Sequence, residues 1–182
     1  MNLGIFSHCT IDEIRIGDGS YERPGGPACY CAFAARNLGF DVELATKFGA
    51  DFTFTEQLQK NKIRFENTPS QKLTTRFKIE VNESQRIMWL QNICDEIDYK
   101  KISADGIIVS PVFNEVSEST LDKIKTDSDM VFLDPQGFLR RVSSDKKIFF
   151  ERTDIDLSKI TVLKSDPNEV FNLTQRDRKS VV

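Results

Sequence analysis

The chain has 182 residues, of which 29% are charged, and its formal net charge at pH 7 is −3. This length supports one domain with a buried core, while the weakly acidic balance predicts no nucleic-acid partner. No run approaches the roughly 18 apolar residues of a membrane-spanning helix, and the first residues lack the basic start and cleavage site of a signal peptide, so we expect a cytoplasmic protein without membrane association.

The first half of the chain alternates apolar strands with helical segments. Residues 3–11 are apolar and predict a buried strand, and residues 13–22 alternate around Gly17-Asp18-Gly19, which is typical of a partly exposed strand with a tight turn. The other expected elements are helices over 27–38 and 51–62 and strands over 41–49 and 63–67.

The second half opens with two alternating strands over 74–90, which predict a hairpin around Asn82-Glu83-Ser84. Nearly all-apolar strands then alternate with helices, a pattern that predicts a parallel sheet covered on both faces. The expected elements are strands over 105–111, 129–135 and 159–166, and helices over 115–126 and 167–175.

These elements predict one three-layer α/β domain that spans residues 1–182. The alternating strands near 13–22 and 74–90 would form a separate, smaller and partly exposed sheet. In parallel α/β sheets, ligands bind beyond the carboxyl ends of the strands, so a binding site is expected there.

The turn Pro24-Gly25-Gly26-Pro27 precedes the helix predicted over 27–38. Pro is tolerated at a first helical position because the N–H that it lacks would be unpaired there, and glycines leave room for a ligand. The helix is apolar on all sides, which predicts that it is buried. Its N-terminus would present free N–H donors and a positive dipole end to a cavity. The alternative is a sharp turn that needs glycine for its backbone alone.

Several motifs follow one another in a characteristic order: Asp12 after the first strand, then GGPACYCAFAARNLG, TKFGADF, DPQGFLR and LKSDPNEVFNL. In this order they resemble the ribokinase-like, or PfkB, family of carbohydrate kinases, and the resemblance covers essentially the whole sequence. It implies a three-layer α/β sandwich with a small β-sheet lid. It also implies transfer of the γ-phosphate of ATP, with Mg²⁺, to a hydroxyl of a sugar, nucleoside or related polyol.

The resemblance also implies roles for individual residues. Asp12 would bind substrate hydroxyls, and the backbone of Gly25 and Gly26 would close over them. Tyr30 stands where many sugar kinases carry Asn, and its phenol could bind the substrate or fill core space. Arg140 follows DPQGF and could reach the substrate cavity or be a solvated helix residue. The lid would exclude water during transfer and could pair two subunits into a homodimer, as in some relatives.

Asp166-Pro167-Asn168-Glu169 resembles the family's Asn-x-x-Glu motif, with Asp in place of Asn. In the family this element helps to place magnesium and phosphates, and carboxylate oxygens suit such a hard cation. The same residues also make a good helix start, with Asp166 as N-cap and Glu169 at N3, so capping alone is the alternative.

The family's catalytic base, an Asp in a Gly-Ala-Gly-Asp turn, has no counterpart in these 182 residues. Asp51 lies in the similar letters FGADF, but it follows the second core strand, so a structural role near a helix start is expected. We therefore expect a C-terminally incomplete chain that carries the sugar-binding part and the lid and has weak or no kinase activity by itself. The alternative function is a non-catalytic sugar- or nucleoside-binding module.

Other residues have simpler interpretations. No G-x-G-x-x-G follows the first strand, which argues against a nicotinamide-binding Rossmann enzyme. His8 is the single histidine and is expected to be a packed, hydrogen-bonded core residue, so no zinc site is expected. The four cysteines are expected to be buried, reduced thiols.

Overall fold

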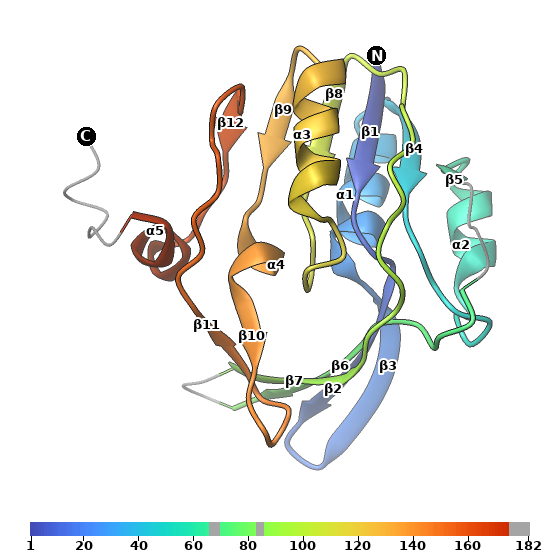
Figure 1. Cartoon of the computed structure of the whole chain (residues 1–182). Coiled ribbons are helices and arrows are strands. Elements are labelled where there is room, and N and C mark those ends of the chain that lie inside the picture. Colours follow the sequence, from blue (N-terminus) through green and yellow to red (C-terminus); the bar gives the residue numbers. More distant parts are fainter. Residues whose placement is uncertain (66–69, 83–85, 175–182) are drawn as a thin grey trace.

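A parallel six-stranded sheet forms the centre of the computed structural model, which describes residues 1–65, 70–82 and 86–174 (Figure 1). The strand order is β12-β9-β8-β1-β4-β5, and every neighbouring pair is parallel. The strands are β1 (Asn2–Phe6), β4 (Asp41–Ala45), β5 (Arg64–Phe65), β8 (Gly106–Val109), β9 (Val131–Leu133) and β12 (Val162–Leu163).

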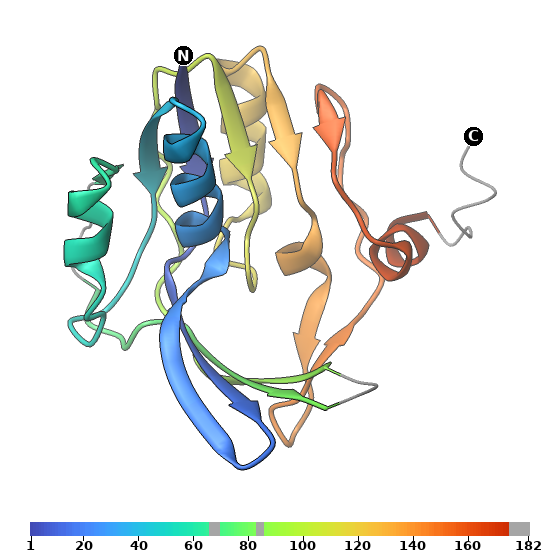
Figure 2. The ribbon, with the colours of Figure 1, turned by 180° about the vertical axis from the view of Figure 1, so that it is seen from behind.

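Helices cover both faces of this sheet, as the alternation of apolar strands and helices predicts. Helix α1 (Gly26–Asn37) lies on one face and α3 (Glu118–Asp127) on the opposite face, and Figure 2 shows the α1 side. The remaining helices are α2 (Thr55–Lys60), α4 (Gln136–Leu139) and α5 (Pro167–Thr174). Over the described ranges 1–65, 70–82 and 86–174, no helix is long and apolar enough to cross a bilayer.

Two apolar clusters fill the space between the sheet and its helices. Because side chains of a strand point alternately to its two faces, Ile5 packs on the α1 side and Phe6 on the α3 side. The α1-side cluster includes Ala28, Ala32, Val42, Leu44 and Leu58, and the α3-side cluster includes Val109, Leu121, Ile124, Val131 and Leu133.

A second sheet lies beneath the carboxyl ends of the parallel strands (Figure 1). Its four strands, in the order β3-β2-β6-β7, are β2 (Thr10–Ile16), β3 (Gly19–Gly25), β6 (Arg76–Val81) and β7 (Arg86–Asn92). Its inner face is joined to the main body by a third apolar cluster, which includes Ile14, Phe77, Ile79, Leu90, Val112 and Phe113. This contact fixes the small sheet over the edge where a parallel sheet binds ligands.

The segment predicted as one strand over 3–11 is in fact two strands joined by a buried link. Strand β1 ends at Phe6 and β2 begins at Thr10 because the chain leaves the large sheet for the small one here. The ring of His8 fixes this link: Nδ1 lies 2.8 Å from Thr75 Oγ1, and Nε2 lies 2.8 Å from the carbonyl oxygen of Asp95. The expected packed and hydrogen-bonded role of His8 is confirmed, but its place within the first strand is wrong.

The expectation that α1 is buried on all sides is also wrong. Its Ala28, Cys29, Ala32 and Ala35 are buried, whereas Tyr30, Ala34 and Asn37 are exposed. The helix is an outer layer, so only the side that faces the sheet is covered. Its many small residues allow the helix to pack closely on the sheet, and they do not mean that the helix is buried on all sides.

Other boundaries differ from the expected ones at segment ends. The predicted helix over 51–62 is confined to α2, and the strand over 41–49 stops at Ala45. The hairpin of β10 (Arg140–Val142) and β11 (Ile148–Phe150) was not predicted. The expected turn at Glu83-Ser84, residues 66–67 and residue 175 lie outside the described residues.

Glu115 joins the links that follow β1 and β8. Its side chain is buried, Oε1 accepts from the backbone N–H groups of His8 (3.0 Å) and Val112 (2.7 Å), and Oε2 accepts from that of Phe113 (2.7 Å). Three main-chain donors from two separate loops therefore depend on one carboxylate.

The first prediction concerns this carboxylate. Replacing Glu115→Ala leaves three buried N–H groups without their acceptor, and we expect it to lower the free energy of unfolding by about 3 kcal/mol or more. Urea denaturation measures the change. The control Glu96→Ala removes an exposed carboxylate and should change stability by less than ~0.5 kcal/mol. Equal effects of the two substitutions would show that Glu115 does not hold the loops together.

Candidate functional site

A cavity of about 190 Å³ lies where the small sheet meets the N-terminus of α1 and the segments that follow β8 and β9. Four stretches that are far apart in the sequence supply its walls. The cavity is lined by Thr10, Asp12, Gly26, Pro27, Tyr30, Phe77, Arg86, Met88, Val112, Gln136 and Arg140. Four of the predicted site residues, Asp12, Gly26, Tyr30 and Arg140, therefore lie at one cavity.

Asp12 places a carboxylate on the inner side of strand β2, where it is only 6% exposed. Its Oδ1 accepts a hydrogen bond from the Thr10 hydroxyl at 2.8 Å, and among the described residues no donor bonds to Oδ2. Burial raises the pKa of Asp12 above its usual value, although the Thr10 bond and nearby guanidinium groups act to lower it. The free oxygen can accept a hydrogen bond from a polar ligand.

The two glycines of the turn have different surroundings. A Cβ on Gly25 would lie 2.2–2.5 Å from the atoms of the Asp12 carboxyl group, so Gly25 is the surface on which that group rests. Gly26 has φ +78°, a conformation that favours glycine, and its Cβ would lie 2.5 Å from the His8 carbonyl oxygen. Gly26 lines the cavity, whereas Gly25 is covered by Asp12, which corrects the expectation that both glycines lie open to the ligand.

The N-terminus of α1 opens toward this cavity. Gly25 is the N-cap, no side chain caps the helix among the described residues, and Pro27 stands in its first turn. Free N–H groups and the positive end of the helix dipole therefore lie next to the Asp12 carboxylate.

Tyr30 lies one turn into α1 with its side chain partly in solvent, 44% exposed. The Arg23 guanidinium lies over its ring, 5.5 Å from the centroid. Burial raises the pKa of the Tyr30 phenol, and the nearby Asp12 carboxylate adds to this shift. The alternative that Tyr30 fills core space is wrong, since its ring lines the cavity.

Arg140 joins α4 to β10 and reaches the cavity wall, which excludes the alternative of a solvated helix residue. Nη1 donates to the Val112 carbonyl oxygen and Nη2 to Gln136 Oε1, both at 2.9 Å. Burial lowers the pKa of Arg140, and the like charge of Arg86 lowers it further.

Sequence patterns alone did not find several cavity residues. Arg86 is the first residue of β7. The alternating pattern of this strand predicts that one of its faces is turned inward, but not that Arg86 lies at a cavity. Thr10 belongs to no motif, and Gln136 lies within the quoted motif DPQGFLR but had no role assigned to it. Proximity to Asp12 and Arg140 was the one available signal for them.

Asp166 and Glu169 do not line the cavity, and they form a reciprocal cap at the start of α5. Asp166 Oδ1 accepts from the N–H groups of Asn168 (2.8 Å) and Glu169 (2.9 Å), while Glu169 Oε2 accepts from the N–H of Asp166 (2.7 Å). This is the capping arrangement weighed as the alternative. Each carboxylate keeps a second oxygen without a donor among the described residues, so the pair also fits Mg²⁺, which is commonly held by one or two carboxylates together with phosphates.

Asp51 has the structural role expected of it. Its Oδ1 accepts from the N–H (2.8 Å) and the hydroxyl (2.7 Å) of Thr74, which ties the loop before α2 to the segment that enters β6. Burial acts to raise the pKa of Asp51, but its hydrogen bonds, mainly the two from Thr74, together outweigh this effect and hold the pKa below its usual value.

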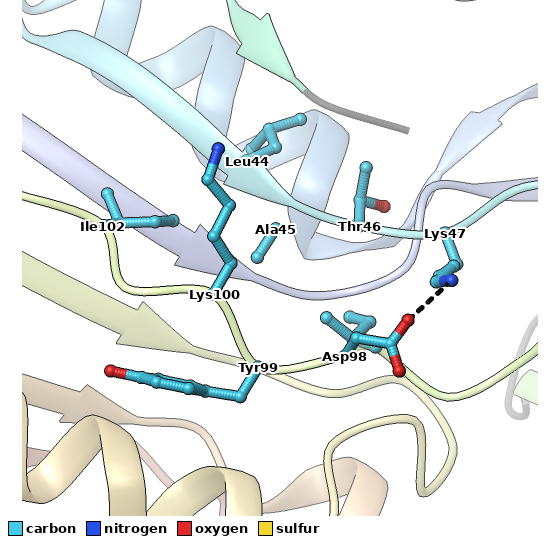
Figure 3. A pocket seen from close by; sticks show the side chains of 9 residues that line it. Leu44, Ala45, Thr46, Lys47, Asp98, Tyr99, Lys100 and Ile102 are labelled. Atoms are coloured by element: carbon cyan, nitrogen blue, oxygen red, sulfur yellow. Dashed lines mark ion pairs between the residues drawn. The ribbon is translucent and has the colours of Figure 1, made fainter. Parts of the chain in front are cut away.

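A second, smaller cavity of about 100 Å³ lies between the end of β4 and the segment 97–102 (Figure 3). Lys47 Nζ and Asp98 Oδ2 form an ion pair across it at 3.0 Å. None of the predicted site residues lines this cavity, and its three charged side chains are already paired, Lys47 with Asp98 and Lys100 with Glu43 at 3.5 Å.

Comparison with known proteins shows the fold. No protein-family model and no curated protein matches the chain. Among solved structures, it is similar to a pyrophosphate-dependent kinase of the ribokinase family complexed with a pyrophosphate analog and myo-inositol, with a TM-score of 0.83 and 18% identity over 96% of this chain and 64% of that one.

Two ribokinases are also similar. The enzyme from Thermotoga maritima gives a TM-score of 0.68 at 15% identity, over 93% of this chain and 60% of that one. The enzyme from Cryptococcus neoformans var. grubii, in complex with ADP, gives a TM-score of 0.60 at 20% identity, over 76% of this chain and 52% of that one. The chain therefore has a ribokinase-like α/β fold, and it spans less than two thirds of the length of these structures.

The second prediction follows from the buried charge of Asp12. Because the folded pKa is raised above the unfolded one, ionisation of Asp12 costs stability, and this cost appears as the pH rises through the folded pKa. Asp12→Asn should therefore melt at a higher temperature than the unaltered chain at pH 7. The difference should vanish below pH 3.8, the ordinary pKa of the group.

Melting curves of both proteins across this pH range test the expectation. Asp18→Asn, at an exposed aspartate in the β2–β3 turn, is the matched control and should give no pH-dependent difference. A lower melting temperature for Asp12→Asn at pH 7 would mean that the carboxylate stabilises the fold instead.

The third prediction concerns Gly25. Its φ is −133°, which any residue adopts, so Gly25→Ala acts through the clash with the Asp12 carboxyl group alone. We expect a loss of about 1–3 kcal/mol in unfolding free energy, measured by urea denaturation. Gly19→Ala, where the new Cβ meets nothing closer than 3.6 Å, should be close to neutral. Two equally mild effects would contradict the packing of Asp12 against Gly25.

Proposed function

We propose that the chain provides the acceptor-binding part of an ATP-dependent carbohydrate kinase of the ribokinase type, with a sugar, nucleoside or related polyol as acceptor. The observation that supports this most is the buried Asp12 carboxylate, which lines a cavity beyond the carboxyl ends of parallel strands and has one oxygen without a donor among the described residues. A carboxylate accepts hydrogen bonds from vicinal hydroxyls, and the small sheet covers the site as a lid that excludes water. The neighbour bound to myo-inositol adds support from the fold.

Each cavity residue has a role in this proposal. Asp12 accepts hydrogen bonds from ligand hydroxyls, and the helix start at Gly26 offers N–H donors to ligand oxygens. Tyr30 contributes a flat face and a phenol at the open side. Arg140 is fixed by two hydrogen bonds and holds one wall in place. Together these residues bind and orient the acceptor, which is the main contribution a protein makes to phosphoryl transfer.

Phosphoryl transfer forms a bond between the acceptor oxygen and the γ-phosphorus, breaks the bond to the β-phosphate oxygen, and removes the hydroxyl proton. Mg²⁺ held by Asp166 and Glu169 would neutralise phosphate charge during the step. In the ribokinase-like family the proton goes to the Asp of a Gly-Ala-Gly-Asp turn, and no such turn occurs in the 182 residues. We therefore propose that these residues alone bind the acceptor with weak or no turnover.

The lid carries a further part of the proposal. Ile16, Tyr21 and Val81 lie on neighbouring strands of the small sheet and are 55%, 48% and 38% exposed. Exposed apolar side chains on one sheet support pairing of two lids in a homodimer. The single-domain organisation with an inserted lid and the cytoplasmic location remain predictions.

A non-catalytic sugar- or nucleoside-binding module is the second candidate. The cavity would serve both functions equally, because binding a polyol does not require the Gly-Ala-Gly-Asp turn. The coding DNA distinguishes the two, because a continuing reading frame that encodes this turn favours the kinase.

The fourth prediction tests the proposed function in two assays. In thermal unfolding, a panel of sugars, nucleosides and cyclitols should contain a ligand that raises the melting temperature by roughly 5 °C when present at 100 times its Kd. Asp12→Ala should remove the shift, whereas Asp18→Ala should keep it. ATP consumption with the same panel should stay at background.

Two results would contradict the proposal in different ways. If no polyol shifts the melting temperature, the cavity is not an acceptor site. Clear turnover of ATP by the 182 residues would refute the claim that they lack activity, while leaving the acceptor site intact.

A further inference from the structure

The cavity carries more positive than negative charge. Its lining includes two guanidinium groups, Arg86 and Arg140, for one carboxylate, Asp12. A third guanidinium, that of Arg23, lies over the Tyr30 ring beside the same opening. A ligand with only neutral hydroxyl groups can be bound by a carboxylate and by N–H donors. Such a ligand does not require an excess of positive charge in the cavity.

Arg140 is held in place with donor capacity left over. Its two hydrogen bonds use one N–H on each Nη atom, and the guanidinium lies 5.9 Å from the centre of the Phe77 ring. Its Nε is enclosed and has no acceptor among the residues that the structure describes. A guanidinium carries five N–H donors, so Arg140 is incompletely satisfied by the protein alone.

Arg86 faces the same cavity from the small sheet and has even fewer partners. Its side chain is exposed, and within residues 1–65, 70–82 and 86–174 it forms no ion pair. Its charge also acts on Arg140, whose pKa it helps to lower. Two like charges therefore face one pocket from opposite elements, β7 and the α4–β10 junction.

The carboxylates near Arg140 are engaged elsewhere. Asp134 pairs with Lys164 at 2.9 Å, and Glu115 accepts three backbone N–H groups. Glu169 caps α5 through the Asp166 N–H and does not line the cavity. Asp12, whose Oδ1 is bound by Thr10, is the remaining acid at the cavity, and it cannot neutralise two guanidinium groups.

We infer that the acceptor of this site is an anionic polyol, a sugar or cyclitol that carries a phosphate or a carboxylate, with its anion at Arg86 and Arg140 and its hydroxyls at Asp12. This inference rests on the proposed function and names the substrate class for it. Guanidinium groups bind oxyanions through paired, charge-assisted hydrogen bonds, and the bound anion would relieve the repulsion between the two arginines. Asp12 at the same time disfavours an anion on its own side, which sets the orientation of the ligand.

Isothermal calorimetry on the 182-residue chain tests this with matched ligands. The pairs are myo-inositol against myo-inositol 1-phosphate, and glucose against glucose 6-phosphate and gluconate, with inorganic phosphate alone as the anion control. Since hydrogen bonds to charged groups are the stronger kind, we expect a phosphorylated or carboxylated polyol to bind at least ~10-fold more tightly than its neutral counterpart. The phosphate and carboxylate ligands show which anion the site prefers.

Arg86→Gln should reduce the ratio of anionic to neutral affinity to less than ~3-fold, and Arg86→Lys should give an intermediate ratio because it keeps the charge but loses the planar fork. The matched control is Arg15→Gln, on the same sheet, where the arginine is exposed, pairs with Glu80 at 3.7 Å and does not line the cavity. It should leave the ratio unchanged.

The possible outcomes separate the two proposals. Neutral polyols that bind as tightly as anionic ones, or a ratio unaffected by Arg86→Gln, would overturn the anionic class while the acceptor site stands. Inorganic phosphate that binds as tightly as the phosphorylated polyols would also overturn it, since the site would then recognise a bare anion. If no polyol of either kind binds, both proposals fall.

Discussion

The site depends on one constraint, which is that a carboxylate must be kept charged and largely out of water at the point where the chain passes from one sheet to another. Asp12 rests directly on the Cα of Gly25 and, within the part of the chain that the structure describes, accepts a hydrogen bond from one donor, Thr10. Removing a charge from water is costly unless partners replace the lost hydration. The structure supplies only part of them, through Thr10 and nearby guanidinium groups, so a demand for hydrogen-bond donors remains at the cavity. A ligand that brings hydroxyl donors meets that demand.

The same constraint explains how the fold is arranged around the cavity. The parallel sheet provides the edge, the small sheet lies below it, and the link between them is fixed by the His8 ring and the Glu115 carboxylate (Figure 1). Because the two glycines lack side chains, the hairpin of β2 and β3 can run directly into α1 and bring the helix start to Asp12. Positive charge then comes from elements far along the chain, β7 and the α4–β10 junction. The apolar core lies between the large sheet and its helices, whereas the charged and incompletely hydrogen-bonded groups lie at the carboxyl edge of that sheet. Residues that stabilise the fold are thus separate from residues that form the site, as is usual in proteins.

Much of this arrangement follows from the sequence, for physical reasons that can be named. Nearly all-apolar strands separated by helices have few solutions other than a covered parallel sheet, so the layers were predicted correctly. The resemblance to the ribokinase-like family implied that Asp12, Gly26, Tyr30 and Arg140 belong to one site, and the structure does put them at one cavity. Tertiary packing decided the rest. Apolar composition did not reveal that α1 has an exposed side, because small residues suit close packing as well as full burial. Arg86 was missed because only the folding of a hairpin brings it opposite Arg140, and the short β10–β11 hairpin has no strong strand pattern.

The most direct measurement is the ionisation of Asp12 itself, followed by the NMR shift of its carboxyl carbon as the pH is changed, with and without a bound polyol. In the free chain the pKa should lie above the ordinary 3.8, and a bound polyol should lower it because hydroxyl donors stabilise the charged form. A pKa that starts at the ordinary value, or one that does not move when a polyol binds, would contradict the role assigned to this carboxylate.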